Sequence, residues 1–145
     1  MTTFQTTREI AASPAEVFAA FAAPPRLAKW WGPKGFRNTF AICEFRPGGA
    51  WEFTMHGPDG ASYPNTSQFV EIDAPHKIVI DHLCAPYFRL TVELLAVGNA
   101  TRVSWVQVFE DADVAAAVAH IVEPSNEQNL DRLTLEVEAG IATLS

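Results

Sequence analysis

The sequence predicts an α+β domain in which a curved antiparallel sheet of about seven strands packs against one long C-terminal helix. Residues 3–12 alternate polar and apolar side chains, and turn signals divide residues 37–111 into further strand-like segments. From Asp111 onward the pattern is helical. An antiparallel sheet with one apolar face needs a cover, and only this last helix is long enough, so we expect residues 1–145 to form one domain.

The first expected strand, Thr3–Ala12, leads into a short helix with a well-specified start. Ser13 is a favourable N-cap, Pro14 occupies the first helical position, and Glu16 completes a capping box. Two adjacent prolines end this helix. A second short helix is expected from about Pro25 to Trp30, before a Gly-Pro pair.

The central part of the chain is expected to contain about six strands joined as a meander. Its turn signals are RPGG (46–49), GPDG (57–60), DAPHK (73–77) and VGNAT (97–101). The GPDG segment is expected to close a hairpin between two strands. Acidic residues at positions 110, 111 and 113 favour a helix start there, because they complement the helix dipole.

Alternation within the strands predicts which side chains face the helix. The inward set comprises Trp51, Phe53, Met55, Phe88, Leu90, Val92, Leu94, Val103, Trp105, Gln107 and Phe109. On the helix, spacings of three and four predict one inward stripe of Val114, Val118, Ile121, Leu130, Leu133, Val137, Ile141 and Leu144. Leu135 lies off this stripe and would be available for a homodimer or another protein contact.

Two amides fall on otherwise apolar inward faces, Gln107 on a strand and Asn126 on the helix. An unpaired buried amide costs roughly 1–3 kcal/mol. Either the two amides bond each other, the backbone or water, or they orient a ligand inside a cavity with apolar walls. Pro124 would kink or split the helix beside Asn126, or would make a harmless break at the surface.

Trp30 and Trp31 are adjacent, so their side chains cannot share one face. We expect one ring to pack between the short helix and the sheet, and the other to line the mouth of a cavity. Trp31 is the expected mouth residue, because Gly32 and Pro33 redirect the chain beside it. The alternative is that both rings are structural.

Composition limits the classes of partner. The 145-residue chain is 48% hydrophobic and 19% charged, as expected of a packed domain. Its formal net charge of −7 disfavours nucleic acids and anionic membrane surfaces. The sequence has neither an apolar run long enough for membrane insertion nor a secretory signal, which predicts a cytoplasmic location. Cys43 and Cys84 are expected to be reduced thiols rather than a disulfide.

Several short motifs occur in a characteristic order along the chain. They are WWGP (30–33), RPGG (46–49), PDG (58–60), EIDAPHKIV (71–79), the turn at 99–102 and NLDRL (129–133). Together they resemble the START-like (SRPBCC) superfamily with the helix-grip fold. Within that superfamily, the chain resembles the branch named for activators of the heat-shock protein 90 ATPase. The resemblance extends from the first strand through the last helix.

The resemblance implies a deep apolar cavity between the sheet and the long helix. Members bind lipids, sterols, polyketides or other hydrophobic small molecules; some are aromatases or cyclases, and some form dimers. Related sequences often have Gly-Trp where this chain has Ser125 and Asn126, so the identity of a ligand does not carry over. The eukaryotic co-chaperones also have a second domain that 145 residues do not accommodate, which weakens the case for a chaperone role.

Few side chains suggest catalysis. Glu44 would be a general base if it entered the cavity, although an outward, ion-paired position is expected. His82 is a second candidate base, and with Cys84 it places two metal-ligand types on one strand face. The spacing identifies no third ligand, so we expect neither a metal site nor a cofactor.

The leading hypothesis is a binding protein for a small hydrophobic molecule. Its predicted ligand-binding residues are Trp31, Trp51, Phe53, Met55, Phe88, Leu90, Trp105, Gln107, Asn126, Leu130 and Leu133. One alternative is a cyclase-, aromatase- or hydrolase-like enzyme in the same cavity, using Glu44 or His82. The other is a protein-interaction module that acts on a chaperone ATPase.

Overall fold

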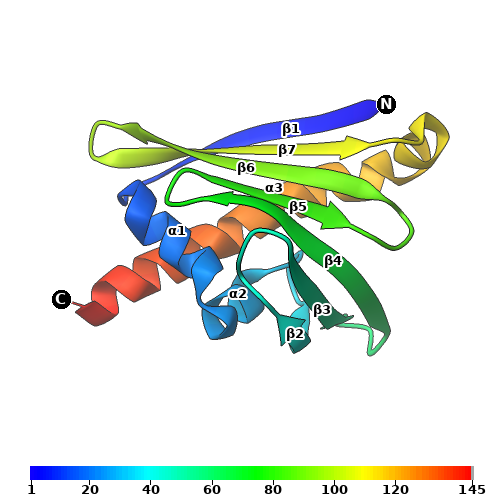
Figure 1. Ribbon diagram of the computed structural model, residues 1–145, viewed down its shortest axis with the longest axis horizontal. Helices are drawn as coiled ribbons and strands as arrows, with labels where there is room; N and C mark the ends of the chain where they lie inside the picture. The colour runs from blue at the N-terminus through cyan, green and yellow to red at the C-terminus, as the bar shows by residue number, and fades with distance from the viewer. Residues whose placement is uncertain (145) are drawn as a thin grey trace.

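The computed structural model describes residues 1–144 and confirms the predicted arrangement of one antiparallel sheet around a long helix (Figure 1). Its elements are β1 (Thr2–Ile10), α1 (Pro14–Ala22), α2 (Pro24–Trp30), β2 (Arg37–Cys43), β3 (Gly49–His56), β4 (Ser62–Asp73), β5 (Lys77–His82), β6 (Phe88–Val97), β7 (Ala100–Phe109) and α3 (Ala112–Leu144). Two short helices follow the first strand, as predicted.

The seven strands form one sheet in the order β1-β7-β6-β5-β4-β3-β2, and every neighbouring pair is antiparallel. The meander therefore runs from β2 to β7, and β1 returns to pair with β7. In Figure 1, α3 crosses one face of the sheet, and α1 and α2 lie beside the C-terminal half of α3. This arrangement packs residues of all three helices into one core with the sheet.

The predicted capping box is present at the start of α1. The Glu16 N–H donates to Ser13 Oγ over 3.2 Å, and the Ser13 N–H donates to Glu16 Oε1 over 2.9 Å. Helix α2 begins at Pro24, one residue earlier than expected, because proline is favourable in the first turn of a helix. The two short helices are therefore separated only by Ala23.

The inward faces of the strands agree with the predicted alternation. Their large apolar side chains form one buried core with α1, α2 and the second half of α3. Trp51, Phe69, Val92, Val103 and Trp105 are all almost completely buried. Burial of each such side chain is worth roughly 1.5–3 kcal/mol, which fixes the register of the strands.

The predicted stripe on the first half of α3 is only partly correct: Val118 is half-buried and packs against the core, but the other two positions are wrong. Val114 and Ile121 are exposed, whereas Ala115 is fully buried against Phe4 and Phe109. The two phenylalanine rings already fill this end of the interior at a centroid separation of 5.6 Å, so only a small helix residue fits there. Farther along α3 the predicted inward positions 130, 133 and 137 are buried, whereas the side chain of Leu144 lies outside the described residues.

Pro124 does not split the last helix, because α3 continues through it from Ala112 to Leu144. The side chain is exposed, and the residue lies on the wall of a groove between β1 and α3. None of the helices in the described part of the chain combines the length and hydropathy needed to cross a membrane.

Candidate functional site

A cavity of about 190 Å³ lies between the sheet and the middle of α3. Its walls are mostly apolar and aromatic, with a minority of polar side chains. The lining residues are Trp31, Gly32, Pro33, Phe53, Met55, Asn65, Ser67, Ile80, His82, Phe88, Leu90, Trp105, Gln107, Asn126 and Asn129. Apolar walls with a few polar groups are typical of small-molecule sites.

The two inward amides predicted from the sequence meet in this cavity. Asn126 Nδ2 donates to Gln107 Oε1 over 3.1 Å, and both side chains are buried. The amides therefore bond each other, and they also form part of the cavity wall. The two interpretations left open by the sequence are compatible, because one hydrogen bond uses only part of the capacity of each amide.

The adjacent tryptophans have different surroundings. Trp30 is 1% exposed, and its Nε1 donates to the backbone oxygen of Ala20 over 2.9 Å. Trp31 lies on the cavity wall, with its ring centroid 4.9 Å from that of Trp51 and 6.1 Å from that of Trp105. Trp30 thus packs between the short helices, and Trp31 is the ring that reaches the cavity.

Polar side chains of α3 anchor the loop that carries Trp31. Arg132 Nη1 donates to the carbonyl oxygens of Trp31, Gly32 and Pro33 at 2.9–3.1 Å. Arg132 Nη2 reaches two more carbonyl oxygens, those of residues 29 and 36, at 2.7 and 2.8 Å. The Gly32 N–H donates to Asn129 Oδ1 over 3.2 Å. One guanidinium therefore holds the loop against α3, and its partial burial lowers the pKa of Arg132.

His82 lies at the end of β5, on the cavity wall. Its Nδ1 is 2.7 Å from the Pro86 oxygen, and its Nε2 is 2.6 Å from Asn65 Oδ1. The ring stacks on Phe88 with a centroid separation of 4.6 Å. Burial lowers the pKa of His82, although the hydrogen bond to the Pro86 backbone acts in the opposite direction. These contacts fix the ring within the cavity wall.

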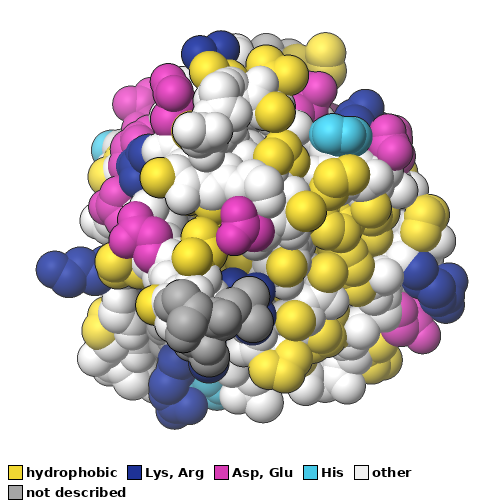
Figure 2. All heavy atoms as spheres, turned by 90° about the vertical axis from the view of Figure 1, so that its left-hand side faces the viewer, with side chains coloured by type: hydrophobic (Ala, Val, Ile, Leu, Met, Phe, Trp, Pro, Cys, Tyr) yellow, Lys and Arg dark blue, Asp and Glu magenta, His cyan; other side chains and the backbone are white. Residues whose placement is uncertain are grey.

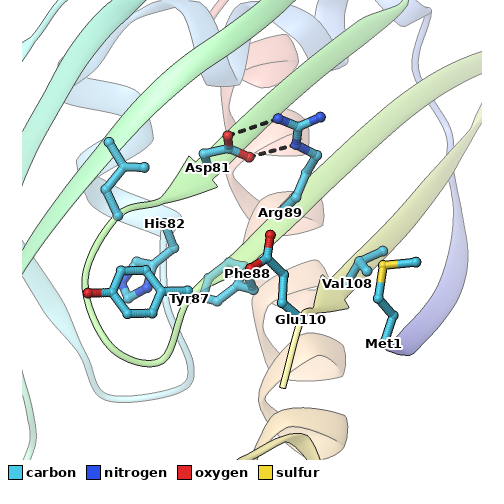
Figure 3. A pocket seen from close by; sticks show the side chains of 9 residues that line it. Met1, Asp81, His82, Tyr87, Phe88, Arg89, Val108 and Glu110 are labelled. Atoms are coloured by element: carbon cyan, nitrogen blue, oxygen red, sulfur yellow. Dashed lines mark hydrogen bonds and ion pairs between the residues drawn. The ribbon is translucent and has the colours of Figure 1, made fainter. Parts of the chain in front are cut away.

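Two outer pockets share residues with the cavity. His82 and Phe88 also line a surface pocket of about 440 Å³. Figure 3 shows this pocket, with Tyr87 beside His82 and with the Asp81 carboxylate paired to the Arg89 guanidinium. Asn126 also lines a groove of about 740 Å³ between β1 and α3. His82 and Phe88 therefore separate the cavity from the surface pocket, and Asn126 separates it from the groove.

Three residues predicted to bind a ligand lie elsewhere. Trp51, Leu130 and Leu133 are at most 1% exposed and belong to the packed core rather than to the lining of the cavity. The other predicted residues all line it: Trp31, Phe53, Met55, Phe88, Leu90, Trp105, Gln107 and Asn126.

Glu44 does not enter the cavity. It follows the last residue of β2, its side chain is about half exposed, and its Oε1 lies 3.5 Å from Arg46 Nη2. The same oxygen accepts a hydrogen bond from the Ala50 N–H over 3.0 Å. Glu44 therefore stabilises the turn between β2 and β3, and the hypothesis that it is a cavity base is wrong.

Sequence reasoning missed several lining residues, among them Asn65, Ser67 and Asn129. The strand β4 lacks a clear apolar alternation at this point, which hid the first two. Counting from the GPDG hairpin would have found them, because Trp51 pairs with Ser67 and Phe53 pairs with Asn65 across β3 and β4. Directly paired residues of antiparallel strands lie on the same face.

Both cysteines are free thiols. Burial raises the pKa of Cys43 to about 11, so this thiol is protonated at neutral pH. Cys84 Sγ lies 3.4 Å from His82 Nε2. Within residues 1–144 no group of three or more His, Cys, Asp or Glu side chains is arranged to hold a metal ion.

The surface away from the cavity also has apolar features. Leu135 is 67% exposed and points away from the core, as predicted. A separate groove lies between α1 and the end of α3, where Ala15, Ala19, Val137 and Ile141 form part of the wall. Figure 2 shows apolar side chains gathering on the face of the molecule that carries α1 and the C-terminal end of α3. These features are compatible with a protein contact.

The antiparallel sheet and the long helix across it define a helix-grip domain of the START-like type. Residues 11–138 match the model of the Activator of Hsp90 ATPase homolog 1-like family. Because the match covers most of the chain, this protein belongs to that family. A search of curated proteins gave no match.

Solved structures of bacterial proteins share the fold. A protein from Arthrobacter aurescens is 26% identical with a TM-score of 0.87, covering 94% of this chain and 86% of that one. A Rhodobacter sphaeroides protein is 24% identical with a TM-score of 0.83, over 95% and 93% of the two chains. A protein of the same family from Silicibacter pomeroyi is 19% identical with a TM-score of 0.78, over 96% and 99%.

Proposed function

We propose that this protein binds a small, largely hydrophobic molecule in the cavity between the sheet and α3. The observation that carries the proposal is the cavity of about 190 Å³, whose walls combine aromatic rings with buried amides. Protein interiors are normally close-packed, so a cavity of this size between the sheet and α3, with polar groups on its wall, needs an explanation. A bound ligand provides one.

The anchored loop supports this proposal. Trp31 and Pro33 line the cavity, and the carbonyl groups of their loop are held by Arg132. A wall held in place before binding loses less conformational entropy when a ligand arrives. The free thiols Cys43 and Cys84 support a reducing, cytoplasmic location for this binding protein.

An enzymatic function is a second candidate because His82 lines the cavity. Both of its ring nitrogens already lie within hydrogen-bond distance of oxygen atoms, from Pro86 and Asn65. Proton transfer to a ligand would require one of these contacts to open. Binding without turnover therefore fits the arrangement better than general acid–base catalysis.

Native mass spectrometry of gently purified protein tests the proposal, followed by denaturing extraction of any bound molecule. We expect an added mass at one molecule per chain. The variant Ser67→Leu is the control, because its larger side chain would fill part of the cavity and should remove the added mass while the fold persists by circular dichroism. An unliganded wild-type protein that also fails to bind any compound of a hydrophobic library would contradict the proposal.

A further inference from the structure

We propose that the ligand of this cavity is a compact, neutral aromatic molecule carrying both a hydrogen-bond donor and a hydrogen-bond acceptor, as an aromatic lactam does. The inference rests on the proposed function, because it specifies the ligand of the same cavity. A ligand of this kind differs from the long-chain lipids and ionised fatty acids that a lipid carrier would bind.

The amide pair supplies one donor and one acceptor to the cavity. Gln107 and Asn126 share a single hydrogen bond of 3.1 Å, from Asn126 Nδ2 to Gln107 Oε1. That bond leaves the Gln107 amide NH₂ and the Asn126 carbonyl for another partner. If both amides were turned over, the pair would still leave one NH₂ group and one carbonyl. The requirement for both kinds of group on the ligand is therefore independent of how the amides are oriented.

Two further side chains add polar capacity on the same wall. Asn129 Oδ1 accepts a hydrogen bond from the backbone N–H of Gly32. This bond orients the Asn129 side-chain amide on the cavity wall and leaves its NH₂ group available to a ligand. Trp105 Nε1 is buried, and within the described residues this indole N–H has no hydrogen-bond partner. Buried polar groups are normally paired, so a ligand that bonds them would relieve a desolvation cost.

The apolar part of the lining determines the shape of the ligand. Trp31, Phe53, Phe88 and Trp105 all present rings on the wall of the cavity. Aromatic rings favour offset or edge-to-face contact with another ring. The cavity of about 190 Å³ is smaller than the range of about 300–1,000 Å³ that is usual for drug-sized ligands. A flat ligand of one or two fused rings therefore fits better than a sterol.

The charge of the lining favours a neutral ligand. Among the described residues that line the cavity there is no Asp, Glu, Lys or Arg side chain. His82 is the titratable lining residue, and both its nitrogens already contact oxygen atoms. A carboxylate or ammonium group placed here would lose its hydration without gaining a counter-charge, whereas an amide or lactam would exchange water for the free amide groups.

Equilibrium dialysis with three probes of similar shape tests this inference. The probes are 2-quinolinone, which has a lactam donor and acceptor, naphthalene, which has neither, and 2-naphthoate, which is charged. We expect the dissociation constant of 2-quinolinone to be about tenfold lower than those of the other two, the difference that two hydrogen bonds would produce. Tighter or equal binding of naphthalene or 2-naphthoate overturns the inference while leaving the proposed function intact.

The double variant Gln107→Met, Asn126→Leu identifies the groups responsible. Replacing both partners of a buried hydrogen bond by apolar groups of similar shape can leave stability nearly unchanged. We expect this variant to lose the tenfold preference for 2-quinolinone and to keep its binding of naphthalene. An unchanged preference in the variant overturns the inference, and so does a long-chain or charged molecule found in the native mass spectrum. Failure of all three probes together with an unliganded native mass overturns the proposed function as well.

Discussion

Replacing Arg132 by methionine should destabilise the protein substantially, because this one side chain holds the loop that follows α2. Its two terminal nitrogens lie 2.7–3.1 Å from five backbone carbonyl oxygens. Methionine retains much of the apolar stem but provides no donor. The carbonyl groups would then have to find water or remain unpaired, and the loop would lose its attachment to α3.

The expected magnitude follows from the number of strong hydrogen bonds. A hydrogen bond to a charged group contributes roughly 1.5–3 kcal/mol, but five acceptors share the few protons of two nitrogens, so the contributions do not add. Counting the equivalent of two strong bonds gives a loss of about 3 kcal/mol in the free energy of unfolding. For a domain of this size, that loss corresponds to a fall in Tm of roughly 10 °C. Arg132→Lys should recover only part of it, because lysine lacks the fork of donors.

Urea unfolding monitored by circular dichroism measures this loss, and Arg8→Met provides the matched control. Arg8 also crosses to α3, but its partners Asp131 and Glu127 are exposed carboxylates. Ion pairs of this kind contribute about 0–1 kcal/mol. Equal losses of stability in the Arg132 and Arg8 variants would show that the contacts of Arg132 to the loop carbonyls contribute no more than exposed ion pairs.

Three further outcomes follow from the structure. Burial lowers the pKa of His82 in the folded protein below the unfolded value of 6.5, so the unfolded state binds more protons below that pH. The stability of wild type relative to His82→Gln should therefore be complete above pH 6.5 and should fall as the pH drops through the folded pKa. A difference in stability that does not change with pH would argue against this assignment. The Cys43 thiol, with its pKa raised to about 11, should react slowly with iodoacetamide at pH 8 in a Cys84→Ser background until the protein is unfolded. Equal reaction rates in the folded and unfolded protein would show that the thiol is not protected. Gly32→Ala should lower the free energy of unfolding in urea by about 1–2 kcal/mol, because φ of Gly32 is +97° and an added Cβ would lie 2.6 Å from Met55 Cε. An unchanged urea midpoint would mean that the loop relaxes freely.

The sheet was predictable because alternation has a period of two, and an error of one residue would move every apolar side chain to the wrong face. The hairpin and the capping box were equally clear, since turn and cap residues act locally. The first half of α3 was harder to place. It contains several alanines among its valines, and periodicity favours the larger Val114 and Ile121 as inward residues, whereas Ala115 is the residue that is fully buried there.

The candidate site was predictable only in part. The inward positions of Gln107 and Asn126 followed from periodicity, but Leu130 and Leu133 share their apparent faces and lie in solid core. Whether an inward side chain borders a cavity or another side chain depends on the volumes of residues from several elements, and no local pattern carries that information. The role of Arg132 was hidden for a similar reason, because its acceptors are carbonyl groups about 100 residues earlier in the chain.

The middle of α3 combines two tasks within two turns of helix. Asn126 and Asn129 reach the cavity, while Asn129 and Arg132 bind the loop that carries Trp31. Spacings of three place these side chains near one another along the helix surface. Apolar residues at the same positions would bury more hydrophobic surface but would leave the loop carbonyls unpaired and the cavity wall without polar groups. Because Asn129 contacts both the loop and the cavity, a ligand that bonds its NH₂ group would also favour the loop position seen in the structure, and ligand binding would then be coupled to the order of residues 31–36.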